Sequence, residues 1–205
     1  MKKKSRQIIL ASASRRRSDI LSSCGIGHEA IPSNIKEIHP AKKHIISSVI
    51  KNAERKVRGI YKGIKDTHRA SCIIGADTLV ALGNEVIGKP VNERDAKNIL
   101  RKFSNADIDI YTGLFIIDTG TNRFASGYEK SSIHVSDIPE KKIDTYFKKL
   151  GISFDKAGGF SIEGAGSIIF DNVKGSYFNI LGLPMGKLNS LFSEIDIELL
   201  DFCDK

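Results

Sequence analysis

The sequence predicts a mixed α/β fold, an elongated mixed β-sheet flanked by helices. Segments with strand and helix patterns alternate along the 205 residues, without internal repeats or low-complexity stretches. Some neighbouring strand segments are joined by short turns as hairpins, which favours a mixed sheet over an all-parallel one. The length and a hydrophobic content of 40% suit one domain over residues 1–205, or two lobes sharing one core.

The segment IILASASRRRSDIL contains the first strand, turn and helix. Residues 8–10 are a short apolar run, and residues 11–14 are all small, so the backbone there can approach a ligand closely. From Arg15 onward, apolar residues recur at helical spacing until Gly25, a natural helix end. A helix start attracts anions, and arginine offers a planar fork of donors that matches phosphate. On its own, the segment fits either a phosphate-binding site or a solvated helix start.

The remaining elements follow from apolar periodicity and from turn and capping residues. The clearest helix covers residues 44–61, with one apolar stripe along its length. We expect a short strand at 29–32 before that helix, and strands at 71–82 and 85–87 around the turn Gly83-Asn84 after it. A helix at 92–103 capped by Asn92, paired strands at 108–117 and 123–135, and a helix at 138–150 ended by Gly151 should follow. The last elements should be strands at 167–170 and 177–181 and a closing helix that begins at Leu183-Pro184.

Composition bounds the partners and the compartment. The net charge of +8 and the pI near 9.3 favour an acidic partner, such as a nucleotide, a nucleic acid or an anionic membrane surface. The three cysteines are far apart and form no CxxC pair, which favours a reducing, cytoplasmic location and gives no support for a structural zinc site. No apolar run is long enough to span a membrane, and three arginines interrupt a start that superficially resembles a lipoprotein signal. The five histidines are scattered, and we expect them to be structural or exposed.

Asp77 and Lys89 are candidate functional residues around the predicted hairpin. Asp77 directly follows an apolar run in IIGADTLV, and Lys89 lies across the hairpin in IGKP. With a two-residue turn, Lys89 would pair with Thr78 and lie on the face opposite Asp77. A three-residue loop or a bulge would bring Asp77 and Lys89 onto one face. We therefore predict a register irregularity here, with the Asp77–Lys89 pair in a cleft. The alternative is a structural Asp77 whose carboxylate accepts backbone N–H groups.

Further charged residues indicate a functional site only when they are considered together. Lys56 lies at the edge of the apolar stripe and Glu37 in a polar loop, and each alone would be an ordinary solvated residue. Together, Glu37 and Asp77 can hold a hard divalent cation through oxygen ligands, as magnesium is held beside nucleotides. No P-loop motif is present, which excludes a P-loop enzyme, and no G-x-S-x-G or paired-His motif indicates an esterase or zinc hydrolase. The positive charge that a triphosphate requires would come from Arg16, Arg17, Lys56 and Lys89.

These residues stand in motifs that resemble those of the Maf proteins, nucleoside triphosphate pyrophosphatases related in fold to the inosine triphosphatase-like enzymes. Several motifs are weak alone, but in this order and spacing they are highly specific and extend over nearly the whole chain. They are LASASRRR at 10–17, Glu37, Lys56 in AERK, GADT at 75–78, GKP at 88–90, YTG at 111–113, DKAGGFSIEG at 155–164 and GSYFNILGLP at 175–184.

The resemblance implies hydrolysis of the α–β phosphoanhydride of a nucleoside triphosphate to a monophosphate and pyrophosphate, with Mg²⁺ or Mn²⁺. It implies that Glu37 and Asp77 bind the metal, that Asp77 activates the attacking water, and that Lys89 lies beside them. It also implies two lobes around a central cleft, a homodimer, and neither a nucleic-acid nor a membrane partner. The residues implied to hold the substrate are Ser12, Ser14, Arg16, Arg17, Lys56, Thr78, Lys156 and Glu163.

Two departures from the family pattern matter. Arg15 replaces a proline that commonly follows the serine of the first motif, which should loosen the turn or add a phosphate contact. Glu163 stands where the pyrimidine-directed branch usually has glutamine, which both donates and accepts, whereas an ionised glutamate only accepts. The branch that acts on 7-methyl-GTP has glutamate there, but its tryptophan before the arginine pair is absent, and GADT and GSYFNILGLP resemble the dTTP/UTP branch. We expect dTTP/UTP, with 7-methyl-GTP as the alternative. If Glu163 points to solvent, Ser161 or a backbone group reads the base.

A basic nucleic-acid-binding or septum-regulatory protein without turnover is the alternative of another class. The high pI allows it, but the basic residues are scattered, tryptophan is absent, and no aromatic-and-basic strand motif is present. Release of pyrophosphate from a triphosphate, against salt-dependent binding to nucleic acid, separates the two classes.

Overall fold

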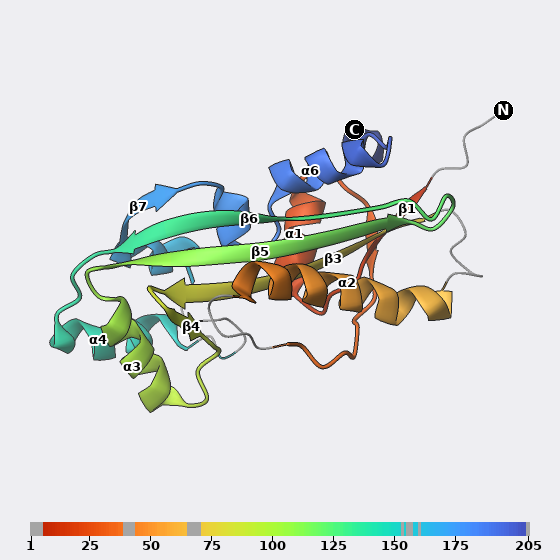
Figure 1. The fold of residues 1–205 in the computed structure, drawn as a ribbon. Helices are drawn as coiled ribbons and strands as arrows, with labels where there is room; N and C mark the ends of the chain where they lie inside the picture. The colour runs from red at the N-terminus through yellow and green to blue at the C-terminus, as the bar shows by residue number, and fades with distance from the viewer. Residues whose placement is uncertain are drawn as a thin grey trace.

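The structure, a computed structural model, describes residues 6–38, 44–64, 71–152, 154, 158–159 and 161–203. A seven-stranded sheet forms its centre, with helices against both faces (Figure 1). The strands are β1 (Gln7–Leu10), β2 (His28–Ala30), β3 (Ser71–Leu82), β4 (Glu85–Ile87), β5 (Ala106–Asp118), β6 (Phe124–Val135) and β7 (Phe170–Lys174). The helices are α1 (Arg15–Ser23), α2 (Ile45–Ile64), α3 (Glu93–Phe103), α4 (Glu140–Leu150), α5 (Tyr177–Ile180) and α6 (Met185–Glu194), with 3₁₀ helices η2 (Gly164–Ile169) and η3 (Leu199–Phe202).

The sheet is mixed, which confirms the predicted fold class. In the order β2-β1-β3-β5-β6-β7, β1 runs parallel to β2 and β3, and the other pairs, including β3–β4 off this path, are antiparallel. The long strands β3, β5 and β6 connect β1, α1, α2 and α6 with the end that carries β4, β7, α3 and α4 (Figure 1). Ile9 packs in a cluster with α2, whereas Ile8 and Leu10 pack with α1 and α6 on the opposite face. Among the described helices, none is long and apolar enough to cross a lipid bilayer.

One edge of β3 contains a gap between two strand partners. On the other edge, β5 pairs with residues 72–82 of β3. On the gapped edge, β1 pairs with residues 71–74 and β4 with residues 80–82. In the ladders of the described residues, residues 75–79 therefore have no strand partner on this edge. This segment contains the GADT motif, and side chains from the segments that follow β1 and β4 line the same pocket as Asp77.

Helix α2 approaches the sheet at very short range beside this gap, because two glycines leave room for it. A Cβ added at Gly75 would lie 2.3 Å from the Ala53 carbonyl oxygen, and one added at Gly113 would lie 2.3 Å from the Val49 carbonyl carbon. Gly113 pairs directly with Asp77, so both lie on the sheet face that α2 covers. The close approach therefore brings the side chains at the edge of α2 into contact with Asp77.

Three expected strands differ from the structure. The strand expected at 29–32 is β2, one to two residues earlier in the chain. The segment 167–170 lies mostly in η2, where the Ser167 hydroxyl donates to the Gly164 carbonyl oxygen at 2.7 Å, and β7 begins only at Phe170. The segment 177–181 forms α5, which Ser176 caps by accepting the N–H of Asn179. In both of these segments, a local serine hydrogen bond outweighs the strand preference of β-branched and aromatic residues.

Candidate active site

A buried lysine joins two carboxylates beside the gap in β3. Lys56 Nζ lies 2.7 Å from Glu37 Oε1 and 2.7 Å from Asp77 Oδ1, and it donates to the Ala76 carbonyl oxygen at 3.2 Å. Lys56 is 8% exposed and Asp77 is 4% exposed, so water screens this pair weakly. Because both carboxylates contact one nitrogen, their oxygens are at most twice 2.7 Å apart. Lys56 therefore offsets the repulsion between two negative groups held close together.

A second buried cation, Arg17, contacts the opposite face of β3 through Thr78. Its Nε donates to the Gly182 carbonyl oxygen at 2.8 Å, and its two terminal nitrogens donate to Ser12 Oγ at 3.2 Å and to Thr78 Oγ1 at 3.0 Å. These acceptors are neutral, and none of the ion pairs among the described residues includes Arg17. A buried guanidinium without a direct ion pair is costly, and two of its five N–H donors have no acceptor among the residues that the structure describes. The arrangement favours an anionic ligand beside Arg17.

A chain of hydrogen bonds links Thr78 to the segment that supplies Gly182. Thr78 Oγ1 lies 3.0 Å from Thr112 Oγ1, and Thr112 Oγ1 donates to the Asn179 carbonyl oxygen at 3.2 Å. The side-chain amide of Asn179 donates to the Ile110 carbonyl oxygen at 3.1 Å and to Ser131 Oγ at 2.9 Å. Thr112 and Asn179 are fully buried. These bonds fix α5 against β5 and so position the carbonyl that holds Arg17.

The cations and carboxylates lie in one pocket with a polar side and an apolar side. The polar side is lined by Ser14, Arg16, Arg17, Glu37, Lys56, Asp77, Thr78 and Lys89. The apolar side is lined by Val80, Ile110, Ile133, Ile162, Ile180 and Leu181. An adjoining depression shares the cationic side chains and extends along the start of α1, with Ser12 and Arg15 in its lining. Four cations against two carboxylates make the polar side suitable for a polyanion that carries a metal.

The charges of the pocket are mutually stabilised. Burial raises the pKa of the Glu37 carboxyl, but the hydrogen bond and charge of Lys56, with the charges of Lys89 and Arg17, outweigh it and hold that pKa below its usual value. Burial lowers the pKa of Arg17, and the Asp77 carboxylate partly offsets this effect. Glu37 is therefore an anion at neutral pH, and Arg17 remains a cation because arginine keeps its proton in proteins.

Comparison with known proteins identifies the family. The sequence model of the Maf-like protein family matches residues 7–195. The chain belongs to the Maf-like protein family. Relatives named dTTP/UTP pyrophosphatase include proteins of Caldicellulosiruptor saccharolyticus (35% identity over 199 residues, 95% of this chain and 98% of the relative), Dictyoglomus thermophilum (35% over 196 residues, 95% and 99%) and Clostridium botulinum strain Hall (36% over 195 residues, 95% and 100%). A solved nucleoside-triphosphatase (dITP/XTP pyrophosphatase) of Mycobacterium abscessus shares 16% identity over 65% of this chain and 76% of that one, with a TM-score of 0.36.

In this Maf-like chain, most of the predicted site residues lie together. The whole polar lining of the pocket was predicted from the sequence, and Ser12 lies directly behind it, accepting from Arg17. Glu163 differs, because its side chain is exposed, accepts from Ser161 Oγ at 3.2 Å, and does not belong to the described pocket lining. Lys156 lies outside the described residues.

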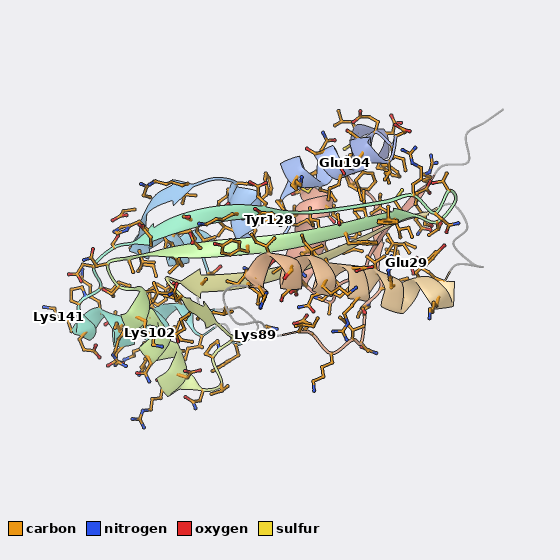
Figure 2. The ribbon with its side chains drawn as sticks, in the orientation of Figure 1. Glu29, Lys89, Lys102, Tyr128, Lys141 and Glu194 are labelled. Atoms are coloured by element: carbon orange, nitrogen blue, oxygen red, sulfur yellow. The ribbon has the colours of Figure 1, made fainter. Side chains whose placement is uncertain are left out.

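The predicted register irregularity between Asp77 and Lys89 is wrong. β3 and β4 pair regularly from Val80–Ile87 to Leu82–Glu85, with a two-residue turn between them. Because β4 ends at Ile87, Lys89 has left the ladder, and strand pairing no longer decides which face it occupies. The predicted cleft is nevertheless present, since Lys89, in the segment after β4 (Figure 2), lines the same pocket as Asp77.

The carboxylates fit a metal that a nucleotide brings with it. Glu37 and Asp77 offer the hard oxygen donors that Mg²⁺ and Mn²⁺ prefer. Within the parts of the chain that the structure describes, no group of three or more His, Cys, Asp or Glu side chains could form an all-protein cage. Magnesium commonly binds through one or two carboxylates with substrate phosphates and water completing its shell. The donor set therefore suits a substrate-bound divalent ion.

Three polar residues around the pocket were missed from the sequence. Asn52 donates to Asp77 Oδ2 at 2.9 Å, so the Asp77 carboxylate is held by side chains and not by the backbone N–H groups of the alternative interpretation. Thr112 and Asn179 connect Thr78 to α5. The sequence does contain a signal for Asn52, because Ser48, Asn52 and Lys56 are polar residues at four-residue spacing beside the apolar stripe of α2. Thr112 and Asn179 lie in the YTG and GSYFNILGLP motifs, but their pairing depends on tertiary contact.

Proposed function

We propose that this protein hydrolyses the α–β phosphoanhydride of dTTP and UTP, releasing the nucleoside monophosphate and pyrophosphate. The observation that carries the proposal is the pocket at the gap in β3, where two buried cations flank two carboxylates. The name that the relatives share, dTTP/UTP pyrophosphatase, supports the reaction and the pyrimidine substrates.

The polar side of the pocket suits the triphosphate. Within the described part of the chain, two N–H donors of Arg17 have no acceptor and no carboxylate pairs with it directly, and Arg16 and Lys89 add positive charge at the lining. The start of α1 adds backbone N–H groups, and its Ser14 cap makes no side-chain hydrogen bond to them. The apolar side, lined by isoleucine, valine and leucine, suits the base and sugar, since ligand pockets combine apolar walls with a few placed polar groups.

Glu37 and Asp77 would hold Mg²⁺ or Mn²⁺, which when bound would offset charge on the phosphate oxygens and lower the pKa of a coordinated water. Asp77 would orient the attacking water toward the α-phosphorus and accept its proton, because it is a buried carboxylate that lines the pocket beside Lys56. Lys56 would hold both carboxylates in place and, with Arg17, stabilise the negative charge that develops on the phosphate oxygens.

Pyrimidine substrates are favoured over 7-methyl-GTP. A preference for the methylated purine would require a carboxylate at position 163 that meets the base. Glu163 is exposed and hydrogen-bonded to Ser161. Ser161 or a backbone group beside Ile162, which does line the pocket, remains the proposed reader of the base.

Initial rates of pyrophosphate release from dTTP, UTP, CTP and 7-methyl-GTP, with added Mg²⁺, test the proposal. We expect dTTP and UTP to be the best substrates, EDTA to abolish turnover, and Asp77→Asn to lower kcat by about a thousandfold, as loss of a general base does. The matched control is Asp118→Asn, another buried carboxylate of the same sheet, paired with Arg6 outside the pocket, which should keep wild-type kcat. Wild-type turnover in Asp77→Asn, or no turnover of any triphosphate by the parent protein, would overturn the proposal.

We further propose that the protein is a homodimer in a reducing cytoplasm. The free thiols of Cys24, Cys72 and Cys203 support the reducing compartment. Light scattering after size exclusion tests the dimer, and a single peak at the 22.5 kDa of one chain would overturn it.

A further inference from the structure

We propose that Asn52 is a positioning residue that holds the Glu37 loop and Asp77 in one fixed arrangement. The inference rests on the proposed function, since it concerns the geometry of the two carboxylates in that site. Asn52 lies in α2, one helical turn before Lys56, and is 1% exposed.

The side-chain oxygen of Asn52 and both hydrogens of its side-chain nitrogen form hydrogen bonds. Its Oδ1 accepts the backbone N–H of Ile38 at 2.8 Å. Its Nδ2 donates one hydrogen to the Ile38 carbonyl oxygen at 3.0 Å and the other to Asp77 Oδ2 at 2.9 Å. The N–H of Ile38 can only meet an acceptor, so the amide has one possible orientation, which aims its nitrogen at Asp77.

The contacts connect the two acidic groups by a short path that does not pass through Lys56. Ile38 directly follows Glu37, so Asn52 holds the backbone of the loop that carries the first carboxylate. The third bond holds the carboxylate oxygen of Asp77 that Lys56 does not contact, since Lys56 binds Oδ1 and Asn52 binds Oδ2. Asp77 is thereby fixed in rotation about its terminal bond as well as in position.

The chemistry of asparagine makes a purely structural explanation weak. A fully buried amide is costly unless every polar group is paired, and asparagine is a poor helix former. If packing alone mattered, an apolar side chain with the same branching, such as leucine, would suit this buried position. The amide is required only if the Glu37 loop and Asp77 must keep a set separation.

Asn52→Leu, which removes all three bonds and keeps the branched heavy-atom skeleton of the side chain, tests the proposal. We expect kcat for dTTP to fall by about 10–100-fold, the usual loss when a group that orients a metal ligand is removed. KM should change less than threefold, because Arg16, Arg17 and Lys89 are untouched. The Mg²⁺ concentration for half-maximal rate should rise about tenfold. Amide hydrogen exchange supplies a readout that needs no substrate, and Ile38 should lose about tenfold in protection, equivalent to one hydrogen bond.

The matched control is Ile60→Ala, which leaves a cavity in the same helix about 12 Å along its axis from Asn52. It should lower stability and exchange protection throughout the sheet, while kcat and the Mg²⁺ requirement of the folded enzyme stay unchanged. Asn52→Asp is the second variant, because it keeps the size and the acceptor for Ile38 but loses both donors, and it should show the same loss of kcat.

The result that would overturn the proposal is an Asn52→Leu or Asn52→Asp protein whose kcat and Mg²⁺ requirement match those of Ile60→Ala. Equal loss of Ile38 protection in Asn52→Leu and Ile60→Ala would also overturn it. If the parent protein hydrolyses no triphosphate, the proposed function fails, and the Ile38 exchange comparison still decides whether Asn52 holds the loop.

Discussion

Replacing Lys56 with methionine removes a positive charge from between two carboxylates and keeps most of the apolar stem of the side chain. The ammonium lies 2.7 Å from an oxygen of Glu37 and 2.7 Å from one of Asp77. Breaking a buried ion pair from one side costs about 3–5 kcal/mol, because the partner charge is left uncompensated. We expect a value near the low end, about 3 kcal/mol, because the Glu37 side chain is 39% exposed and because Asn52 still donates to Asp77.

A loss of about 3 kcal/mol corresponds to a fall in Tm of about 6–12 °C for a chain of this size. Thermal unfolding at pH 7, followed by circular dichroism in the absence of divalent metal, measures it. The control is Lys51→Met, in the same helix, whose lysine side chain is 57% exposed and pairs with Glu54 at 2.9 Å. Such a surface pair contributes less than about 1 kcal/mol, so the control Tm should fall by no more than about 2–4 °C. Equal Tm values for Lys56→Met and Lys51→Met would refute the reasoning.

Three further predictions concern packing, pH and ligand contact. Gly113→Ala should destabilise the fold by about 3 kcal/mol and lower kcat, because the new methyl group would meet backbone atoms of α2 at 2.3–2.5 Å; urea unfolding that gives less than about 1 kcal/mol would contradict this. Burial raises the pKa of the Asp118 carboxyl, but hydrogen bonds from Arg6, Thr121 and the Gly120 backbone hold that pKa below its usual value. The ionised carboxylate therefore stabilises the fold above the unfolded-state pKa, and this stabilisation is lost as pH falls through the folded-state pKa. In urea titrations, Asp118→Asn should therefore destabilise the protein most near pH 7, and this effect should shrink as the pH falls below the usual range of an aspartate; an effect that stays constant down to the lowest pH measured would contradict the assignment. Arg17→Lys loses the planar fork that contacts three neutral acceptors, so KM for dTTP should rise about tenfold, and an unchanged KM would remove Arg17 from the proposed phosphate site.

The strands and helices that bury one clear face could be predicted from the sequence. The bounds of β3 agree with the predicted 71–82, and α3 begins after its predicted cap, Asn92, which accepts the N–H of Asp95. The apolar pattern predicts these elements correctly because burial of apolar side chains supplies most of their stabilisation. In η2 and α5 the same pattern predicts strands wrongly, because a serine hydrogen bond in a short segment competes with strand pairing.

The sequence predicts which residues form the site but not how the fold brings them together. The polar lining follows from residue type and motif order, whereas the way Lys89 reaches it depends on where β4 ends, which no local pattern specifies. The bond from Arg17 to the Gly182 carbonyl joins residues 165 positions apart, so only the folded chain reveals it. Asn52 could have been found as a polar residue one turn before Lys56, but its link to Asp77 depends on the close approach of α2 over Gly75 and Gly113.

Hydrolysis of dTTP in ¹⁸O-labelled water tests most directly whether this pocket directs water to the α-phosphorus. Mass spectrometry of the two products locates the oxygen that enters. We expect the label in thymidine monophosphate, none in pyrophosphate, and labelling about a thousandfold slower with Asp77→Asn. Label in pyrophosphate, or in orthophosphate, would contradict this expectation.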